Sequence, residues 1–281
     1  MIFFKKDVIM VKRMKIEIRK RDAKMKNDLF SIGPLTIHSY GLMIALGILV
    51  CVFMGMYRAR KHGYKDEAVL DIAIFGILSG FIGAKLLYVL VEFDRFLENP
   101  MDVLGSEGFV VYGGIIVGAL AGVIYCRVKK LPFWEYFDLL APSIAVAQGF
   151  GRIGCFLAGC CYGRPTEAFW GVTFPEGSFA PAGVPLIPTQ LISSVGDFAV
   201  AGILLLYSKH NKKAGNVGIL YMVLYGIGRF LVECLRSDDR GTVGILSTSQ
   251  FISIAIILFA IVLFFRHKIF KGIKKENSEE V

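Results

Sequence analysis

The sequence predicts an all-α polytopic membrane protein, namely a bundle of seven transmembrane helices. First, 55% of the 281 residues are hydrophobic and the mean hydropathy is +0.59, which is too apolar for an ordinary soluble domain. Second, the apolar residues gather in blocks close to the ~20 residues that a helix needs to cross a bilayer. Third, the charge of the loops alternates in sign along the chain.

Seven apolar blocks can be delimited to within a few residues, at 41–57, 68–91, 109–126, 136–162, 187–207, 216–235 and 248–265. Each block must be helical, because backbone polar groups have no water partner within lipid. Small residues recur every four positions in the third block, at Gly114, Gly118 and Gly122, and in the second, at Gly76 and Gly80. This spacing favours close helix–helix packing.

Loop charge sets the predicted orientation. Basic clusters follow the first, third and fifth blocks and the last one, whereas the second loop is acidic. Positively charged loops stay in the cytoplasm. We therefore expect a charged cytoplasmic tail at 267–281 and, with seven spans, an outward N-terminus.

The N-terminal stretch 1–28 does not fit this orientation, since it holds ten Lys and Arg residues against four Asp and Glu. One explanation, which we favour, is that translation starts at Met25 or Met14 and the upstream stretch is a start-site artefact. The alternative is a genuine basic extension that is translocated against its charge. It does not resemble a signal peptide, because no apolar h-region with a cleavage site follows the basic run. The transmembrane domain itself is expected at 29–266.

Two arginines lie inside apolar blocks, Arg152 in the fourth and Arg229 in the sixth. A guanidinium at bilayer depth costs about 2.5–3.5 kcal/mol even on the most lenient scale. A bound anion between the two residues would compensate this cost, and in a bilayer the abundant anion is a phospholipid headgroup. Arginine suits this task because its planar fork binds phosphate bidentately. The alternative for Arg229 is a purely structural ion pair with Glu233, four residues on.

Other polar residues share these helices. Gln148 lies four residues before Arg152, so the two share a face, and Tyr225 precedes Arg229 by the same interval. Pro142 and three glycines in the fourth block predict a softened, partly unwound helix around a cavity. Lys85 lies in the second block. It either has a structural role or forms a second contact to the phospholipid headgroup.

No metal site, cofactor or nucleic-acid partner is predicted. The six cysteines lack CxxC spacing and fall in or at the ends of apolar blocks, which favours small packed thiols. A reactive or redox role for Cys155 and the Cys160–Cys161 pair is the alternative. The four histidines are scattered, and the +9 net charge arises mostly from loops and tails, which suits a membrane surface.

Several strings in these blocks resemble the prolipoprotein diacylglyceryl transferases of bacterial inner membranes. They are IHSYGLMIALG, VYGGIIVG, GRIGCFLAGCCYGRPT, PTQL and YGIGRFLVECLR, and the resemblance runs from about residue 30 to 265. It implies a multi-pass enzyme of the cytoplasmic membrane. Such an enzyme moves a diacylglyceryl group from phosphatidylglycerol to the lipobox cysteine thiol of a preprolipoprotein and releases glycerol 1-phosphate. It also implies a seven-transmembrane-helix bundle with an outward N-terminus and a small periplasmic head region.

The resemblance assigns roles to individual residues. Those implied to be catalytic are Arg152, Arg229, Glu233 and Tyr112. Those implied or expected to bind substrate are Arg152, Tyr40, Tyr225, Gly113, Gly114, Gly163, Gln148 and Lys85. The chain departs from the family pattern where Tyr112 replaces the histidine of the HGG motif, and at Cys155, Cys160 and Ile187. It is therefore expected to be a divergent member, in which the arginines contribute more to thiol activation.

Three other functions remain open from the sequence. One is a transferase with the same lipid donor and a different acceptor, which the replaced histidine favours. Another is a transporter or scramblase that uses the arginines as a transient anion site, although no internal repeat is visible. The third is a non-catalytic lipid-binding protein. A monomer is the expected state.

Overall fold

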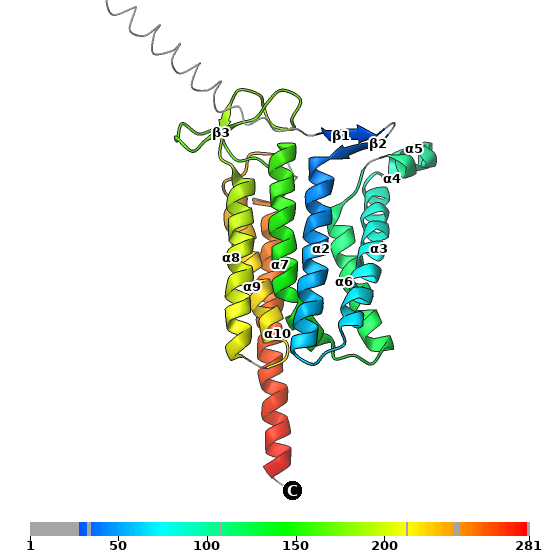
Figure 1. Ribbon diagram of the computed structural model, residues 1–281, viewed down its shortest axis with the longest axis vertical. Helices are drawn as coiled ribbons and strands as arrows, with labels where there is room; N and C mark the ends of the chain where they lie inside the picture. Colours follow the sequence, from blue (N-terminus) through cyan, green and yellow to red (C-terminus); the bar gives the residue numbers. More distant parts are fainter. Residues whose placement is uncertain (1–27, 33–34, 107, 212, 239–241, 280–281) are drawn as a thin grey trace, which may run out of the picture. The chain divides into compact units, whose positions relative to one another are not determined.

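The computed structural model describes residues 28–32, 35–106, 108–211, 213–238 and 242–279 (Figure 1). Within these ranges seven helices are long and apolar enough to cross a membrane, as the sequence predicted. The stretch 1–27, which contains both proposed start sites, lies outside the described residues.

The helices and strands have the following bounds. The seven apolar helices are α2 (Ser39–Lys61), α3 (Asp66–Val91), α6 (Val111–Val128), α7 (Phe133–Ala158), α8 (Thr189–His210), α9 (Asn216–Glu233) and α10 (Thr248–Glu279). Two short helices, α4 (Phe93–Glu98) and α5 (Pro100–Gly105), follow α3. Three antiparallel strand pairs complete the described secondary structure: β1 (Asp28–Ile32) with β2 (Leu35–His38), β3 (Val172–Thr173) with β4 (Pro185–Leu186), and β5 (Thr242–Val243) with β6 (Leu246–Ser247).

The fourth apolar block differs from its prediction in two ways. Helix α7 is continuous from Phe133 to Ala158 with Pro142 inside it, so the expected unwound stretch is wrong. Membrane helices tolerate proline because neighbouring groups can satisfy the freed carbonyl. The helix also ends earlier than the apolar block, so Cys160, Cys161 and Gly163 lie in the turn that follows it.

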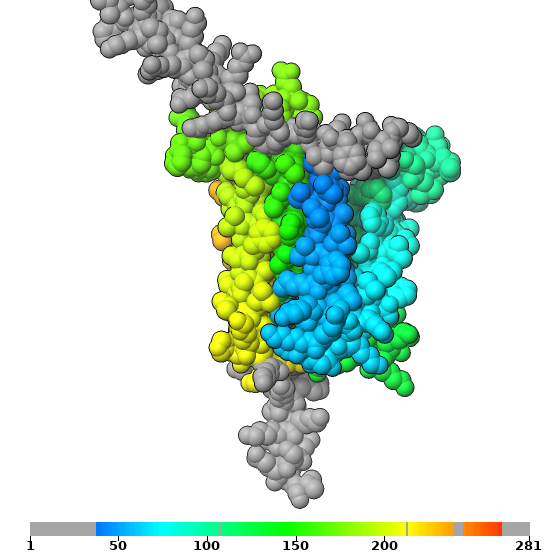
Figure 2. All heavy atoms as spheres, in the orientation of Figure 1, coloured from blue at the N-terminus to red at the C-terminus, as the bar shows by residue number. Residues whose placement is uncertain are grey.

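The chain divides into two compact units, 1–51 with 141–281 and 52–140, and the boundaries fall within α2 and α7. In the second unit, α3 and α6 approach through their small residues. A Cβ added at Gly114 would lie 2.9 Å from the Gly80 carbonyl oxygen, and one at Gly118 would lie 3.0 Å from that of Gly76. Large apolar side chains cover other parts of α3, among them Leu78, Phe81 and Leu90, and are exposed as lipid contact requires. Figure 2 shows the outer surface of α3 in cyan.

Gly83 is among the tightest points of this interface, because an added Cβ would lie 2.5 Å from Val117 Cβ and 2.6 Å from the Gly113 carbonyl oxygen. Gly83→Ala should therefore lower stability by about 1–3 kcal/mol, since a backbone carbonyl cannot move aside cheaply. Gly76→Ala on the same helix is the control, because its Cβ would meet only Gly118 O at 3.9 Å. Thermal unfolding in detergent compares the two variants, and equal midpoints would contradict the assignment.

The side chain of Lys85 is engaged within the same unit. Its Nζ donates to the carbonyl oxygens of Ser106 at 2.7 Å and Gly108 at 3.3 Å, and it lies 5.0 Å from the ring centroid of Phe109. Lys85 thus fastens the segment between α5 and α6 onto α3. Contact between Lys85 and the phospholipid headgroup stays a prediction.

The first unit has two cores. One is formed by Ala141, Leu204 and Val217, where α7, α8 and α9 meet. The other, formed by Phe174, Ala180 and Leu186, lies in the segment between α7 and α8 that carries β3 and β4. We call this segment the head region; Phe156 and Tyr162 pack against its core, so it anchors the turn that follows α7.

Candidate functional site

Arg152 and Arg229 line one cavity of about 90 Å³ between α7, α8 and α9. Tyr225 lies in the same wall, one turn before Arg229, and α8 contributes Ser193 and Asp197. All these residues belong to the first unit. The two guanidinium groups that the sequence singled out therefore share a chamber.

The close approach of α7 and α8 forms one side of this cavity. A Cβ added at Gly149 would lie 2.8 Å from the ring of Phe198, and Ser194 Oγ donates to the Gly149 carbonyl oxygen at 3.0 Å. A larger residue at Gly149 would push α8 away from α7. The glycine that was expected to soften α7 instead brings a polar face of α8 close to Arg152.

One terminal nitrogen of the Arg229 guanidinium is fixed by polar partners, and the other has no hydrogen-bond partner among the described residues. Its Nη2 pairs with Glu233 Oε2 at 2.9 Å and donates to Ser249 Oγ at 2.8 Å, and the two charged side chains are only 10% and 6% exposed. Its Nη1 is buried and has no hydrogen-bond partner among the described residues. Leaving such a donor unpaired costs about 1–3 kcal/mol, and more for a charged group. The geometry thus leaves a buried cationic donor available beside the cavity.

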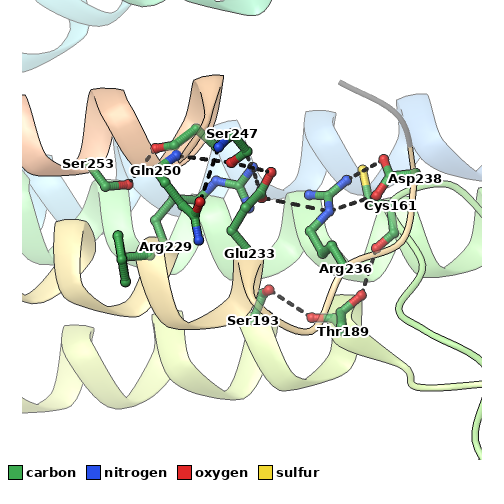
Figure 3. Close-up of polar contacts among 12 residues, drawn as sticks. Cys161, Thr189, Ser193, Arg229, Glu233, Arg236, Asp238, Ser247, Gln250 and Ser253 are labelled. Carbon is green, nitrogen blue, oxygen red and sulfur yellow. Dashed lines mark hydrogen bonds and ion pairs between the residues drawn. The ribbon is translucent and has the colours of Figure 1, made fainter. Parts of the chain in front are cut away.

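A row of polar side chains continues from Arg229 past the end of α9 (Figure 3). Ser247 Oγ donates to Glu233 Oε1 at 3.1 Å, and Arg236 Nε lies 3.9 Å from Glu233 Oε2. Arg236 also binds Asp238 bidentately, at 2.9 and 2.6 Å. Burial lowers the pKa of Arg236, but the hydrogen bonds that Arg236 donates to Asp238 and the surrounding negative charge outweigh burial and raise this pKa above its ordinary value. Glu233 is therefore fixed between two arginines.

The other predicted residues of the first unit lie around this centre. Gln148 Oε1 accepts a hydrogen bond from Tyr221 at 3.0 Å. Tyr40 packs on α7 where a Cβ at Gly154 would lie 3.1 Å from its ring. Gly163 forms an isolated antiparallel β-bridge with Arg236, and its backbone N–H donates to the Ile187 carbonyl oxygen at 3.0 Å. A Cβ added at Gly163 would lie 2.7 Å from Ile187 Cβ. The glycine is required by this close backbone approach.

Four predicted residues belong to the second unit and are described only within it. Tyr112, Gly113 and Gly114 occupy the first turn of α6, and Lys85 lies on α3. The described contacts of both glycines are with α3, where a Cβ at Gly113 would overlap the Gly83 carbonyl oxygen. Substrate binding by these four residues stays a prediction.

Asp197 and Ser193 are site residues that were not predicted from the sequence. Both lie in the cavity wall, and together with Thr189 they form a stripe at four-residue intervals on α8. A carboxylate and a hydroxyl at i and i+4 in an apolar helix mark one polar face. That spacing is therefore a sequence signal for the polar side of the cavity.

Comparisons with known proteins agree with this geometry. Residues 27–266 match the family described as prolipoprotein diacylglyceryl transferase. The chain is 49% identical over 242 residues to the phosphatidylglycerol–prolipoprotein diacylglyceryl transferase of Clostridium tetani, a match that covers 85% of this chain and 97% of that protein. It is 46% identical over 259 residues to phosphatidylglycerol–prolipoprotein diacylglyceryl transferase 2 of Clostridium perfringens, covering 91% of this chain and all of that protein.

A more distant relative shows the same match. The chain is 35% identical over 241 residues to the enzyme of that name from Staphylococcus aureus, covering 83% of this chain and 86% of that protein. The match therefore extends over all seven apolar helices and both arginines of the cavity. This protein belongs to the prolipoprotein diacylglyceryl transferase family and is a multi-pass bacterial membrane protein.

Proposed function

We propose that this protein transfers a diacylglyceryl group from phosphatidylglycerol to the lipobox cysteine thiol of preprolipoproteins and releases glycerol 1-phosphate. The observation that carries the proposal is the shared chamber of Arg152 and Arg229, with Arg229 Nη1 buried beside it and unpaired within the described structure. Family membership and the names of the relatives support the same donor and acceptor.

The two guanidinium groups bind the headgroup phosphate. In the reaction the acceptor sulfur forms a bond to the glyceryl carbon while the bond from that carbon to the phosphate oxygen breaks. The leaving phosphate monoester gains negative charge, and fixed cations in a site without water stabilise it strongly. The proton of the acceptor thiol leaves to a base or to solvent, and the positive field of the arginines favours the thiolate.

The remaining residues have supporting roles in this proposal. Glu233 is a positioning residue that holds Arg229 through the 2.9 Å ion pair. Tyr112 occupies the place of the family histidine and either assists thiol activation or hydrogen-bonds the lipid. The other assigned binding residues are Tyr40, Tyr225, Gly113, Gly114, Gly163, Gln148 and Lys85.

The proposed orientation places the N-terminus outside and the C-terminus in the cytoplasm. The basic last turn of α2, with Arg58, Arg60 and Lys61, supports it, because such clusters stay inside. The catalytic domain is proposed to span 29–266 as a monomer with a cytoplasmic tail at 267–281. The basic stretch 1–28 is proposed to be a start-site artefact, with a genuine extension as the alternative. The head region between α7 and α8 then faces the periplasmic side.

The direct test uses purified full-length protein, phosphatidylglycerol and a lipobox peptide. We expect a peptide product heavier by one diacylglyceryl group, together with free glycerol 1-phosphate. A matched peptide with serine in place of the lipobox cysteine should give no product. Absence of product from the cysteine peptide, with intact folded protein, would reject the proposal in favour of another acceptor or a non-catalytic role.

A further inference from the structure

Three thiols converge at the end of α7, next to the arginine cavity. The Sγ atoms of Cys155, Cys160 and Cys161 all lie within 4.8 Å of one another. Cys155 is buried on α7, and the other two are half-buried in the turn that follows. The spacing of these cysteines in the sequence gave no metal signature, because the convergence depends on a tight reversal of the chain after Ala158.

This reversal is held in a strained conformation. Gly159 has a φ of +72° and Cys161 a φ of +64°, and the left-handed region costs a residue other than glycine about 1–2 kcal/mol. Two buried side chains of the first turn of α8 fix the dipeptide: Thr189 Oγ1 donates to the Cys161 carbonyl oxygen and Gln190 Nε2 to that of Cys160, each at 2.7 Å. The protein thus maintains an energetically unfavourable backbone conformation at Cys161, which brings the sulfurs of Cys160 and Cys161 toward that of Cys155.

Positive charge surrounds the cluster. Arg236 hydrogen-bonds the Cys161 side chain, and Figure 3 shows the two side by side. Arg152 interacts electrostatically with Cys155 and Cys161. Three thiolates around a divalent ion carry one net negative charge, which neighbouring guanidinium groups can balance. A cation that binds these sulfurs must displace the thiol protons.

We propose that Cys155, Cys160 and Cys161 form a three-thiolate site for a thiophilic divalent cation such as Zn²⁺. Zinc–thiolate bonds of about 2.3 Å in a tetrahedron place the sulfurs about 3.8 Å apart, so shifts of about 1 Å complete the site. Thiolate ligands select Zn²⁺ over the hard ions Mg²⁺ and Ca²⁺. Three protein ligands also leave a fourth position open, as in catalytic zinc sites.

The open position suits one further thiol. Provided that the proposed transfer reaction is correct, the acceptor cysteine of the lipobox is the natural fourth ligand. Binding to the cation would release its proton to solvent and hold the sulfur as a thiolate beside Arg152. This would supply the thiol activation that the proposed transfer requires.

The site is tested with Co²⁺ added to the full-length protein, purified in detergent, reduced and freed of metal with a chelator. We expect saturable sulfur-to-cobalt charge-transfer absorption that added Zn²⁺ abolishes. Cys155→Ser, Cys160→Ser and Cys161→Ser should each weaken the band strongly, whereas Cys234→Ser, at an exposed cysteine outside the cluster, should leave it unchanged. Thermal unfolding confirms that each variant is folded.

Absence of the band in fully reduced wild-type protein would overturn the metal site, as would an equal band in the triple Cys→Ser variant. Adding the lipobox peptide to the cobalt-loaded protein tests the fourth position. The cysteine peptide should raise the sulfur-to-cobalt absorption, and an equal response to the serine peptide would overturn that assignment. Arg152→Ala keeps the two hypotheses apart, because it should remove lipid transfer while the cobalt band remains.

Discussion

Replacing Arg152 with alanine is expected to reduce the rate of diacylglyceryl transfer by at least about 10²–10³-fold, the usual loss when one fixed donor to a developing negative charge is removed. Arg152 lies in the cavity wall opposite α9 and shares the chamber with Arg229. Without it, the leaving phosphate meets one guanidinium instead of two. Turnover of phosphatidylglycerol with a lipobox peptide measures the effect.

Two further variants make this result specific. Arg152→Lys keeps the charge but loses the planar fork, so it should recover only part of the rate. Arg95→Ala removes an exposed guanidinium that pairs with Asp102 at 2.7 Å, and it should leave the rate unchanged. Retained transfer in folded Arg152→Ala protein would mean that the cavity does not hold the reacting phosphate.

The helices and the two arginines could be predicted from sequence because their physical causes are local. A run of apolar residues must form a helix in lipid whatever its neighbours are. A guanidinium in such a run is costly whichever way it faces. The glycines of α3 and α6 are equally local signals, and their close contacts confirm the predicted packing.

The rest of the site depends on chain reversals that no helical period encodes. The three thiols converge because the backbone turns back at Gly159 and Cys161 and is fixed by Thr189 and Gln190, about 30 residues further on. Asp197 differs, since its stripe with Ser193 was visible in the sequence and was not used.

Arg229→Ala is expected to abolish transfer and also to destabilise the protein, for two separate reasons. Removing one partner of a buried ion pair leaves the other charge uncompensated, which costs about 3–5 kcal/mol. Here Arg236, 3.9 Å from Glu233, should keep the loss near the lower end of that range. Thermal unfolding in detergent and the transfer assay measure the two effects independently.

The double variant Arg229→Gln with Glu233→Gln separates structure from chemistry. It removes both charges together, so no buried carboxylate is left unpaired, and the Gln side-chain oxygen at 233 can still accept from Ser247. Stability should recover toward that of the wild type, since neutral replacement of a buried pair costs far less than breaking it. If the pair only braces α9 against α10, transfer should recover as well. If Arg229 binds the phosphate through its unpaired Nη1, the double variant should be folded and inactive. Its stability recovers, but it still has no cation at position 229 to bind the phosphate.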